Sequence, residues 1–236
     1  MENILHILKT DYRIQYPRFN DEFPIELEEN CQKLYQEKKF SQLLMTVNSQ
    51  ARIWLFLEIQ DELDDESYFR LLGEVLTFTY ISFDSELFLY LLHHPSRPAS
   101  LRHNVMSNEE QKFHDKLPPE ILIFRGAKVG NRDGFSWTLN KETAMKFAKR
   151  HSPLPGELLT GKCHKNKLIA YFSREEEVLI RPNHVIIEHA LLIDPEEQKN
   201  NLRINHHTET WKHIKSSETY KKFKKNIHQI KQASFL

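Results

Sequence analysis

Glycine is distributed very unevenly along this chain, and that distribution restricts the fold more than any other feature of the sequence. Only six glycines occur among 236 residues, and five of them lie between positions 126 and 161. Residues 1–105 contain Gly73 alone. Because glycine destabilises helix interiors and is favoured where the backbone turns tightly, we expect a helical N-terminal half followed by a region of short strands and turns.

The first half of the chain carries apolar residues in segments suited to buried helices. Apolar positions recur at helical spacing, and Pro95 and Pro98 then interrupt the pattern, which predicts a linker. Ser107 and Glu110 have the spacing of a capping box, so a short helix should open there and reach about His114. The predicted helices lie within 27–40, which is a charged amphipathic stretch, and within 41–60, 66–80 and 85–94, which are apolar enough to be buried.

The periodicity changes after Pro118 and Pro119. Short apolar runs separated by polar turns predict strands, and Asn140 should cap a helix between two of them. The predicted strands are 121–124, 135–139, 168–172, 177–180 and 184–193. Strands in quick succession after a helical half predict an α+β protein with a mainly antiparallel sheet.

Charge is divided unequally although the net charge of the chain is zero. Residues 1–100 hold 17 acidic and 9 basic residues, whereas residues 199–236 hold 9 basic and 2 acidic residues. Apolar residues also lie at helical spacing in this basic tail, at Tyr220, Phe223, Ile227 and Ile230. We therefore divide the chain into a helical subdomain at 1–105, a core at 106–195 and a basic helical extension at 196–236 that packs on the core.

Several classes of protein are excluded by composition. The two cysteines, Cys31 and Cys163, are too few and too far apart for a disulfide framework or a zinc ribbon. No apolar run approaches the length of about 18 residues that a membrane span needs. The N-terminus lacks the basic and apolar regions of a signal peptide. We expect a soluble, reduced, cytoplasmic protein without a membrane partner.

The first candidate functional feature is an arginine at the end of a predicted strand. Arg125 follows a short apolar run and precedes Gly126, where the backbone is free to turn. Its planar, permanently charged guanidinium suits a diphosphate. Ser136 lies 11 residues after Arg125 and shares one strand face with Thr138. Trp137, between them, should point to the opposite face and pack in the core.

The second candidate feature is a pair of glutamates. Glu177 lies 41 residues after Ser136 and opens the apolar run Val178-Leu179-Ile180. Glu175 and Glu177 are expected to share a face, because strand alternation sets the two carboxylates side by side.

This order of motifs resembles the arginine–serine–glutamate class of mono-ADP-ribosyltransferases, which includes cholera-toxin-like and clostridial actin-modifying toxins, vertebrate ecto-transferases and phage-encoded transferases. The resemblance covers residues 118–195, and its most specific part is the segment from Glu175 to Ile180. It departs from the family pattern at Trp137, where the family has a small residue. The resemblance implies a β-core of ADP-ribosyltransferase type and transfer of ADP-ribose from NAD to an acceptor, with release of nicotinamide and no metal.

The resemblance also implies a role for each matched residue. Glu177 would be the catalytic acid, which stabilises the positive charge that develops on the ribose, and Ser136 would order it. Glu175 would orient the acceptor and accept its proton, as a glutamate at this place accompanies arginine acceptors in the family. The implied NAD-binding residues are Arg125, Gly126, Ser136, Thr138 and Glu177.

The acceptor and the biological setting stay open. A protein arginine is the leading acceptor, and RNA or DNA is the alternative because of the basic tail. A catalytically inactive transferase fold that serves as a binding module is a third interpretation. A phage effector, or a bacterial toxin held by an antitoxin or another inhibitor protein, would each fit.

Overall fold

The computed structural model describes residues 1–16, 23–49, 51–78, 85–128, 131–150 and 155–193, together with Ser216, Lys221 and Lys225. Contacts group the chain into two compact units, and the division falls between Leu101 and Arg102. The fold is a mixed α+β fold, as the sequence predicts. The predicted basic extension at 196–236 lies outside the described residues apart from three positions. None of the helices that the structure describes is long and apolar enough to cross a membrane.

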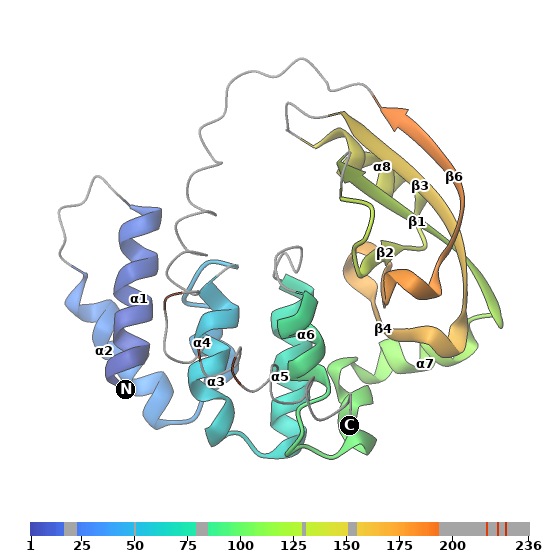
Figure 1. The fold of residues 1–236 in the computed structure, drawn as a ribbon. Coiled ribbons are helices and arrows are strands. Elements are labelled where there is room, and N and C mark those ends of the chain that lie inside the picture. The colour runs from blue at the N-terminus through green and yellow to red at the C-terminus, as the bar shows by residue number, and fades with distance from the viewer. Residues whose placement is uncertain are drawn as a thin grey trace. The chain divides into compact units, whose positions relative to one another are not determined.

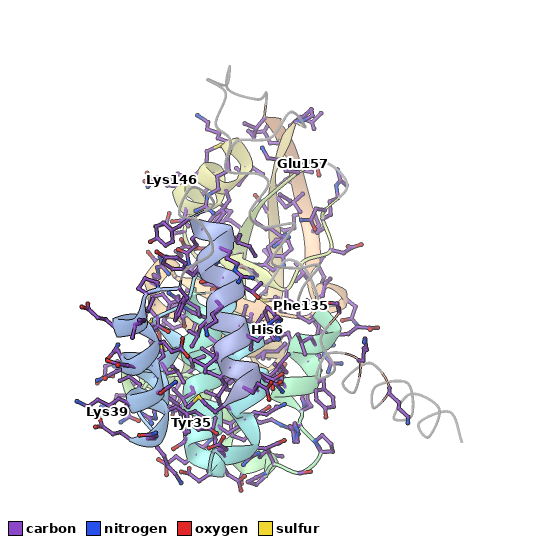
Figure 2. The ribbon with its side chains drawn as sticks, turned by 90° about the vertical axis from the view of Figure 1, so that its left-hand side faces the viewer. His6, Tyr35, Lys39, Phe135, Lys146 and Glu157 are labelled. Atoms are coloured by element: carbon purple, nitrogen blue, oxygen red, sulfur yellow. The ribbon has the colours of Figure 1, made fainter. Side chains whose placement is uncertain are left out.

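The first unit is helical, which confirms the interpretation of the glycine-poor half. Its helices are α1 (Glu2–Gln15), α2 (Ile25–Gln36), α3 (Phe40–Leu44), α4 (Ala51–Ile59), α5 (Asp65–Phe78) and α6 (Ser85–Leu92) (Figure 1). Its interior includes fully buried Tyr68, Phe56 and Phe69. His6, which Figure 2 labels on α1, contacts the ring of Trp54 edge to face.

The segment 41–60, expected as one helix, is divided into two. Asn48 lies between α3 and α4, and its side-chain oxygen accepts a hydrogen bond from the backbone N–H of Ala51 at 3.1 Å. Its backbone N–H and side-chain amide both donate to the carboxylate of buried Asp11. An asparagine that bonds to nearby backbone competes with helix continuation, and here it starts a new helix instead.

The proline segment that the sequence predicts as a linker is bonded to the first unit. Arg97 donates to the carbonyl of Leu63 and to the carboxylate of Asp65, both at 2.8 Å, and to the carbonyl of Gln60 at 2.8 Å. Its guanidinium also lies 4.6 Å from the centre of the Tyr68 ring. These contacts fasten the residues between the two prolines to the helices of the first unit.

In the residues that the structure describes, the second unit has a six-stranded sheet, two α-helices and short 3₁₀ turns. All strand pairs are antiparallel, in the order β4-β5-β2-β1-β3-β6, and α8 packs against β1 and β3 (Figure 1). Its elements are α7 (Asn108–Lys116), β1 (Glu120–Lys128), β2 (Ser136–Thr138), α8 (Lys141–Lys149), β3 (Gly156–His164), β4 (Leu168–Phe172), β5 (Glu177–Ile180) and β6 (Ile186–Ile193).

Local sequence signals located several of these elements well. The capping box of α7 is present in both directions between Ser107 and Glu110, and Asn140 caps α8 through its side-chain oxygen. The strands β4 and β5 have the predicted bounds. The strand β3, however, was not predicted. Its two glycines and its lysine give it little of the composition that marks a strand.

Two glycines allow α8 to lie directly on the sheet. A Cβ atom at Gly126 would stand 1.9 Å from the carbonyl oxygen of Ala144 and 2.4 Å from the backbone nitrogen of Ala148. A Cβ at Gly156 would stand 2.0 Å from the carbonyl oxygen of Ala148. Gly126 therefore does not form the turn that the sequence suggests. It lies within β1, where it makes room for the backbone of a helix.

We expect Gly126→Ala to lower the free energy of unfolding by about 1–3 kcal/mol, because the added methyl meets backbone atoms that cannot rotate away. Urea unfolding of the purified protein measures this change. Leu122→Ala on the same strand is the control, since Leu122 is 47% exposed and its truncation should cost within about 0.5 kcal/mol. Equal stability of the glycine variant and the wild type would show that α8 does not pack this closely.

Candidate functional site

The pairing of three neighbouring strands brings the predicted site residues together. β2 lies between β1 and β5 in the sheet, and Thr138 is opposite Phe124 on one side and Glu177 on the other. This register places Arg125 of β1 beside β2, and it places Glu177 beside the same short strand. Residues up to 52 positions apart in the sequence therefore meet across three strands.

Arg125 is held by backbone carbonyls of β2 and of the connection that leads from β1 to β2. It lies in the interior of β1 rather than at a strand end, because β1 continues to Lys128 through its pairing with β3. The guanidinium donates to the carbonyl of Ser136 at 2.6 Å and to the carbonyl of Asn131 at 3.4 Å. A Cβ at Gly134 would stand 2.0 Å from the guanidinium, so this glycine makes room for it. The orientation of the fork is thus set by main-chain groups.

A second arginine fastens the same connection to the sheet. Arg132 donates through Nε to the carboxylate of Glu157 at 2.9 Å, and a second bond from its Nη2 makes the pair bidentate. Glu157, labelled in Figure 2, lies near the start of β3. Its side chain is buried. The paired guanidinium lowers the pKa of Glu157. The backbone that holds Arg125 is therefore itself anchored on β3.

Ser136 and Glu177 form the central contact of the site. The hydroxyl of Ser136 donates to Oε1 of Glu177. The neighbouring Trp137 is 2% exposed and donates through its indole nitrogen to the carbonyl of Gly134 at 3.1 Å. This confirms the expectation that Trp137 packs in the core. Strand alternation accounts for both observations, because Ser136 and Trp137 point to opposite faces of β2.

The carboxyl group of Glu177 has an unusually high proton affinity. Burial raises its pKa to about 7, and the negative charge of Glu175 acts in the same direction. The hydrogen bond from Ser136 and the positive charge of Arg125 lower the pKa but do not offset burial. Burial that disfavours an ionised carboxylate is typical of functional sites, where a group is placed for a task rather than for stability.

Glu175 does not share a strand face with Glu177, contrary to the sequence-based expectation. It ends a single 3₁₀ turn, Ser173–Glu175, and Glu176 follows in the left-handed region with a φ of 48°. The change of backbone direction at Glu176 breaks the alternation that a continuous strand would have. β5 starts only at Glu177. Glu175 is nevertheless near enough for its charge to raise the pKa of Glu177.

Thr138 and its neighbours hold this turn in place from the β2 side. The hydroxyl of Thr138 donates to the carbonyl of Glu175 at 2.7 Å and accepts from the backbone N–H of Asn140 at 3.0 Å. The backbone N–H of Leu139 donates to the carbonyl of Glu176 at 2.9 Å. The resemblance implies that Thr138 binds NAD, but its hydroxyl is hydrogen-bonded within the protein. Gly126, another residue that the resemblance implies in NAD binding, contacts α8.

Sequence reasoning missed two contributors to the site. Gly134 carries no signal of its own in the sequence, and Glu110 is predicted only as part of a helix cap. The structure places Gly134 under the guanidinium of Arg125, and it places one carboxylate oxygen of Glu110 on Ser173, at the start of the glutamate turn. Both contacts join residues that are separated in the sequence, so no local sequence pattern predicts them.

Comparisons of the chain with models of protein families, with curated proteins and with solved structures find no match. Among the described residues, no three or more histidine, cysteine, aspartate or glutamate side chains are grouped as metal ligands would be.

The raised pKa of Glu177 predicts a difference in pH dependence between the wild type and Glu177→Gln. The folded protein holds this proton more tightly than the unfolded chain, whose carboxyl titrates near 4.5. The wild type should therefore lose stability relative to the variant as the pH rises from the unfolded pKa through about 7. At still higher pH the difference should stay constant, with the variant the more stable protein.

Urea unfolding of both proteins between about pH 4 and pH 8 measures this difference. Other titrating groups contribute equally to both proteins, so the difference isolates Glu177. Parallel pH profiles would contradict a pKa raised by burial.

Proposed function

We propose that this protein is an NAD-dependent mono-ADP-ribosyltransferase that modifies a macromolecule, with arginine side chains of proteins as the acceptor. The observation that carries this proposal is the hydrogen bond from Ser136 to Glu177, formed next to the guanidinium of Arg125. The arginine, serine and glutamate of the resemblance come from three separate segments, and three adjacent antiparallel strands bring them to one place. A β-core of ADP-ribosyltransferase type is part of the same proposal.

The geometry suits the bond that such an enzyme breaks. Cleavage between nicotinamide and C1′ of the ribose leaves positive charge on the sugar, as in glycoside hydrolysis. A carboxylate that bonds the ribose 2′-hydroxyl near this charge stabilises the transition state more than the ground state. Glu177 is suited to this role because the Ser136 hydroxyl fixes one of its oxygens before the substrate arrives. The ionised carboxylate of Glu177 is the form that stabilises this charge, and it becomes the major form above about pH 7.

Arg125 is suited to hold the phosphates of NAD. A guanidinium has five N–H donors. The described part of the chain provides acceptors for Nη1 and Nη2, at the carbonyls of Ser136 and Asn131, but none for Nε. Nε is buried, so the donors that remain for an anionic ligand are the second N–H groups of Nη1 and Nη2. This arrangement also argues against an inactive binding module, because all three parts of the constellation are intact.

Glu175 completes the proposed chemistry at the acceptor. A new bond forms between a guanidinium nitrogen and C1′, while the bond from C1′ to nicotinamide breaks and its electron pair leaves with neutral nicotinamide. The arginine is cationic at neutral pH, so it must lose a proton as the new bond forms. Glu175 lies on the turn directly before Glu177, and its carboxylate would orient the guanidinium and accept that proton.

The nucleic-acid alternative depends on residues that the structure largely leaves out. Of the four lysines grouped at 221–225, Lys222 and Lys224 lie outside the described residues, whereas Lys221 and Lys225 are exposed. No feature of the described site favours RNA or DNA over protein as the acceptor. The same holds for an antitoxin or another inhibitor, which stays a proposal drawn from the resemblance alone.

We expect Glu177→Gln to reduce ADP-ribose transfer by about 10²–10³-fold or more, as removal of a preorganised charge-stabilising group does in other enzymes. The glutamine retains an acceptor for Ser136, so the fold should persist. The measurement is label transfer from NAD to proteins of a cell lysate, with nicotinamide release followed in parallel. Glu176→Gln is the matched control, because it alters the adjacent residue, and it should transfer normally. Transfer by Glu177→Gln within about tenfold of the wild type would refute the proposal.

Glu175→Gln should separate the two half-reactions. Transfer to an arginine acceptor should stop because the base that removes the guanidinium proton is lost. Release of nicotinamide by water should continue, because water requires less orientation than a guanidinium. Assays with a synthetic arginine peptide and with water as the only acceptor measure the two rates. Loss of both activities to the same extent would place Glu175 with Glu177 in ribose chemistry and would remove the argument for arginine.

A further inference from the structure

The turn that carries Glu175 is fastened on a second side, by a residue that the proposed chemistry does not use. Oε1 of Glu110 accepts hydrogen bonds from the backbone N–H of Ser173 at 2.8 Å and from its hydroxyl at 3.0 Å. Its other oxygen accepts from the backbone N–H of Ser107 at 2.9 Å, within the capping box of α7. One side chain thus joins the start of a helix to the first residue of the glutamate turn.

The helix that supplies Glu110 is itself firmly placed on the sheet. Phe113 of α7 stacks on Tyr171 of β4, with ring centres 4.3 Å apart. The backbone N–H of Tyr171 donates to the sulfur of Met106, just before the helix, at 3.2 Å. Because α7 and β4 are joined at these points, Glu110 reaches Ser173 from a fixed position.

We propose that Glu110 is a positioning residue, which sets the location of Glu175 relative to Glu177 and thereby directs ADP-ribose to the acceptor rather than to water. This inference rests on the proposed transferase function. Thr138 and Leu139 hold the carbonyls of residues 175 and 176 from the β2 side, and Glu110 holds Ser173 from the α7 side. Without Glu110, the backbone N–H and hydroxyl of Ser173 lose their acceptor, and the turn is held only by the strands on either side of it and by the contacts from β2.

Loss of the contact between Glu110 and Ser173 should displace Glu175 more than Glu177. Glu177 is the first residue of β5 and is paired with Thr138 and Phe172, so the sheet retains it. Glu175 lies between Ser173 and β5 on a turn without strand pairing. A displacement of about 1 Å at a reacting group is sufficient to cost about 10²-fold in rate. Loss of the contact should therefore reduce transfer much more than hydrolysis.

The test compares Glu110→Ala with Ser107→Ala in the full-length protein. Both variants destroy the capping box and should lower the free energy of unfolding, by about 1 kcal/mol for the loss of the cap. Only Glu110→Ala also removes the bonds to Ser173. The readout is the ratio of arginine-peptide labelling to nicotinamide release with water as the acceptor.

We expect this ratio to fall by about tenfold or more in Glu110→Ala and to stay at the wild-type value in Ser107→Ala. Glu110→Gln, which retains an oxygen for Ser173, should restore most of the ratio. Equal ratios in the two alanine variants would overturn the inference, because helix capping alone would then explain any loss.

A second readout keeps the inference separate from the proposed function. Carbon-13 NMR of glutamate side chains reports the pKa of Glu177, to which Glu175 contributes. In Glu110→Ala the displaced turn should lower this pKa toward the ordinary carboxyl value, whereas Ser107→Ala should leave it unchanged. If the wild type releases no nicotinamide, the proposed function fails. An unchanged Glu177 pKa in Glu110→Ala overturns the positioning inference whether or not activity is found.

Discussion

The three-residue strand β2 is the element on which the whole site depends. It pairs with β1 on one side and with β5 on the other, and its residues contribute a carbonyl, a hydroxyl and a buried indole to three different neighbours. A shift of this strand by one residue would exchange the faces of Ser136 and Trp137. The buried indole opposes such a shift, because Trp137 would then have to leave the core. The core residue and the site residue therefore enforce the same register.

The site is arranged at a cost to stability. Glu177 is held where burial disfavours its charge, and neither Ser136 nor Arg125 fully compensates. Arg125 is also desolvated, which lowers its pKa, and its Nε has no acceptor among the described residues. A fold selected only for stability would replace such groups by apolar side chains. The presence of both Glu177 and Arg125 is expected for a preorganised site, because groups that are already in place need no reorganisation during a reaction.

The sequence allowed prediction of those parts of the structure that are determined by neighbouring residues. The caps at Ser107 and Asn140 act within three residues, and β4 and β5 are short apolar runs between polar turns. The strand β3 was missed because its glycines serve tertiary contacts. Gly156 lies against α8, and Gly161 lies at a shift of register with β6. Without β3, the continuation of β1 past Arg125 could not be foreseen.

The same distinction applies to the candidate site. The order and spacing of Arg125, Ser136 and Glu177 were sufficient to group them, because each lies on a strand and strand pairing brings them together. The predicted orientation of Glu175 is wrong, because the prediction applies strand alternation to a residue that lies on a turn before the strand begins. The contact between Glu110 and Ser173 spans 63 residues and joins a half-buried carboxylate to an exposed serine, so neither spacing nor hydropathy indicates it.

The left-handed conformation of Glu176 determines which amino acids position 176 can hold. Asparagine, aspartate and glycine adopt this conformation readily, whereas valine, isoleucine and threonine are excluded by their branched Cβ. Substitution at this position is therefore restricted by a backbone torsion, although its side chain is exposed and belongs to neither proposed chemical role. In variants selected for stability alone, position 176 should drift toward asparagine or glycine. The separation of the two flanking carboxylates would be retained through such drift, because the torsion and not the side chain sets it.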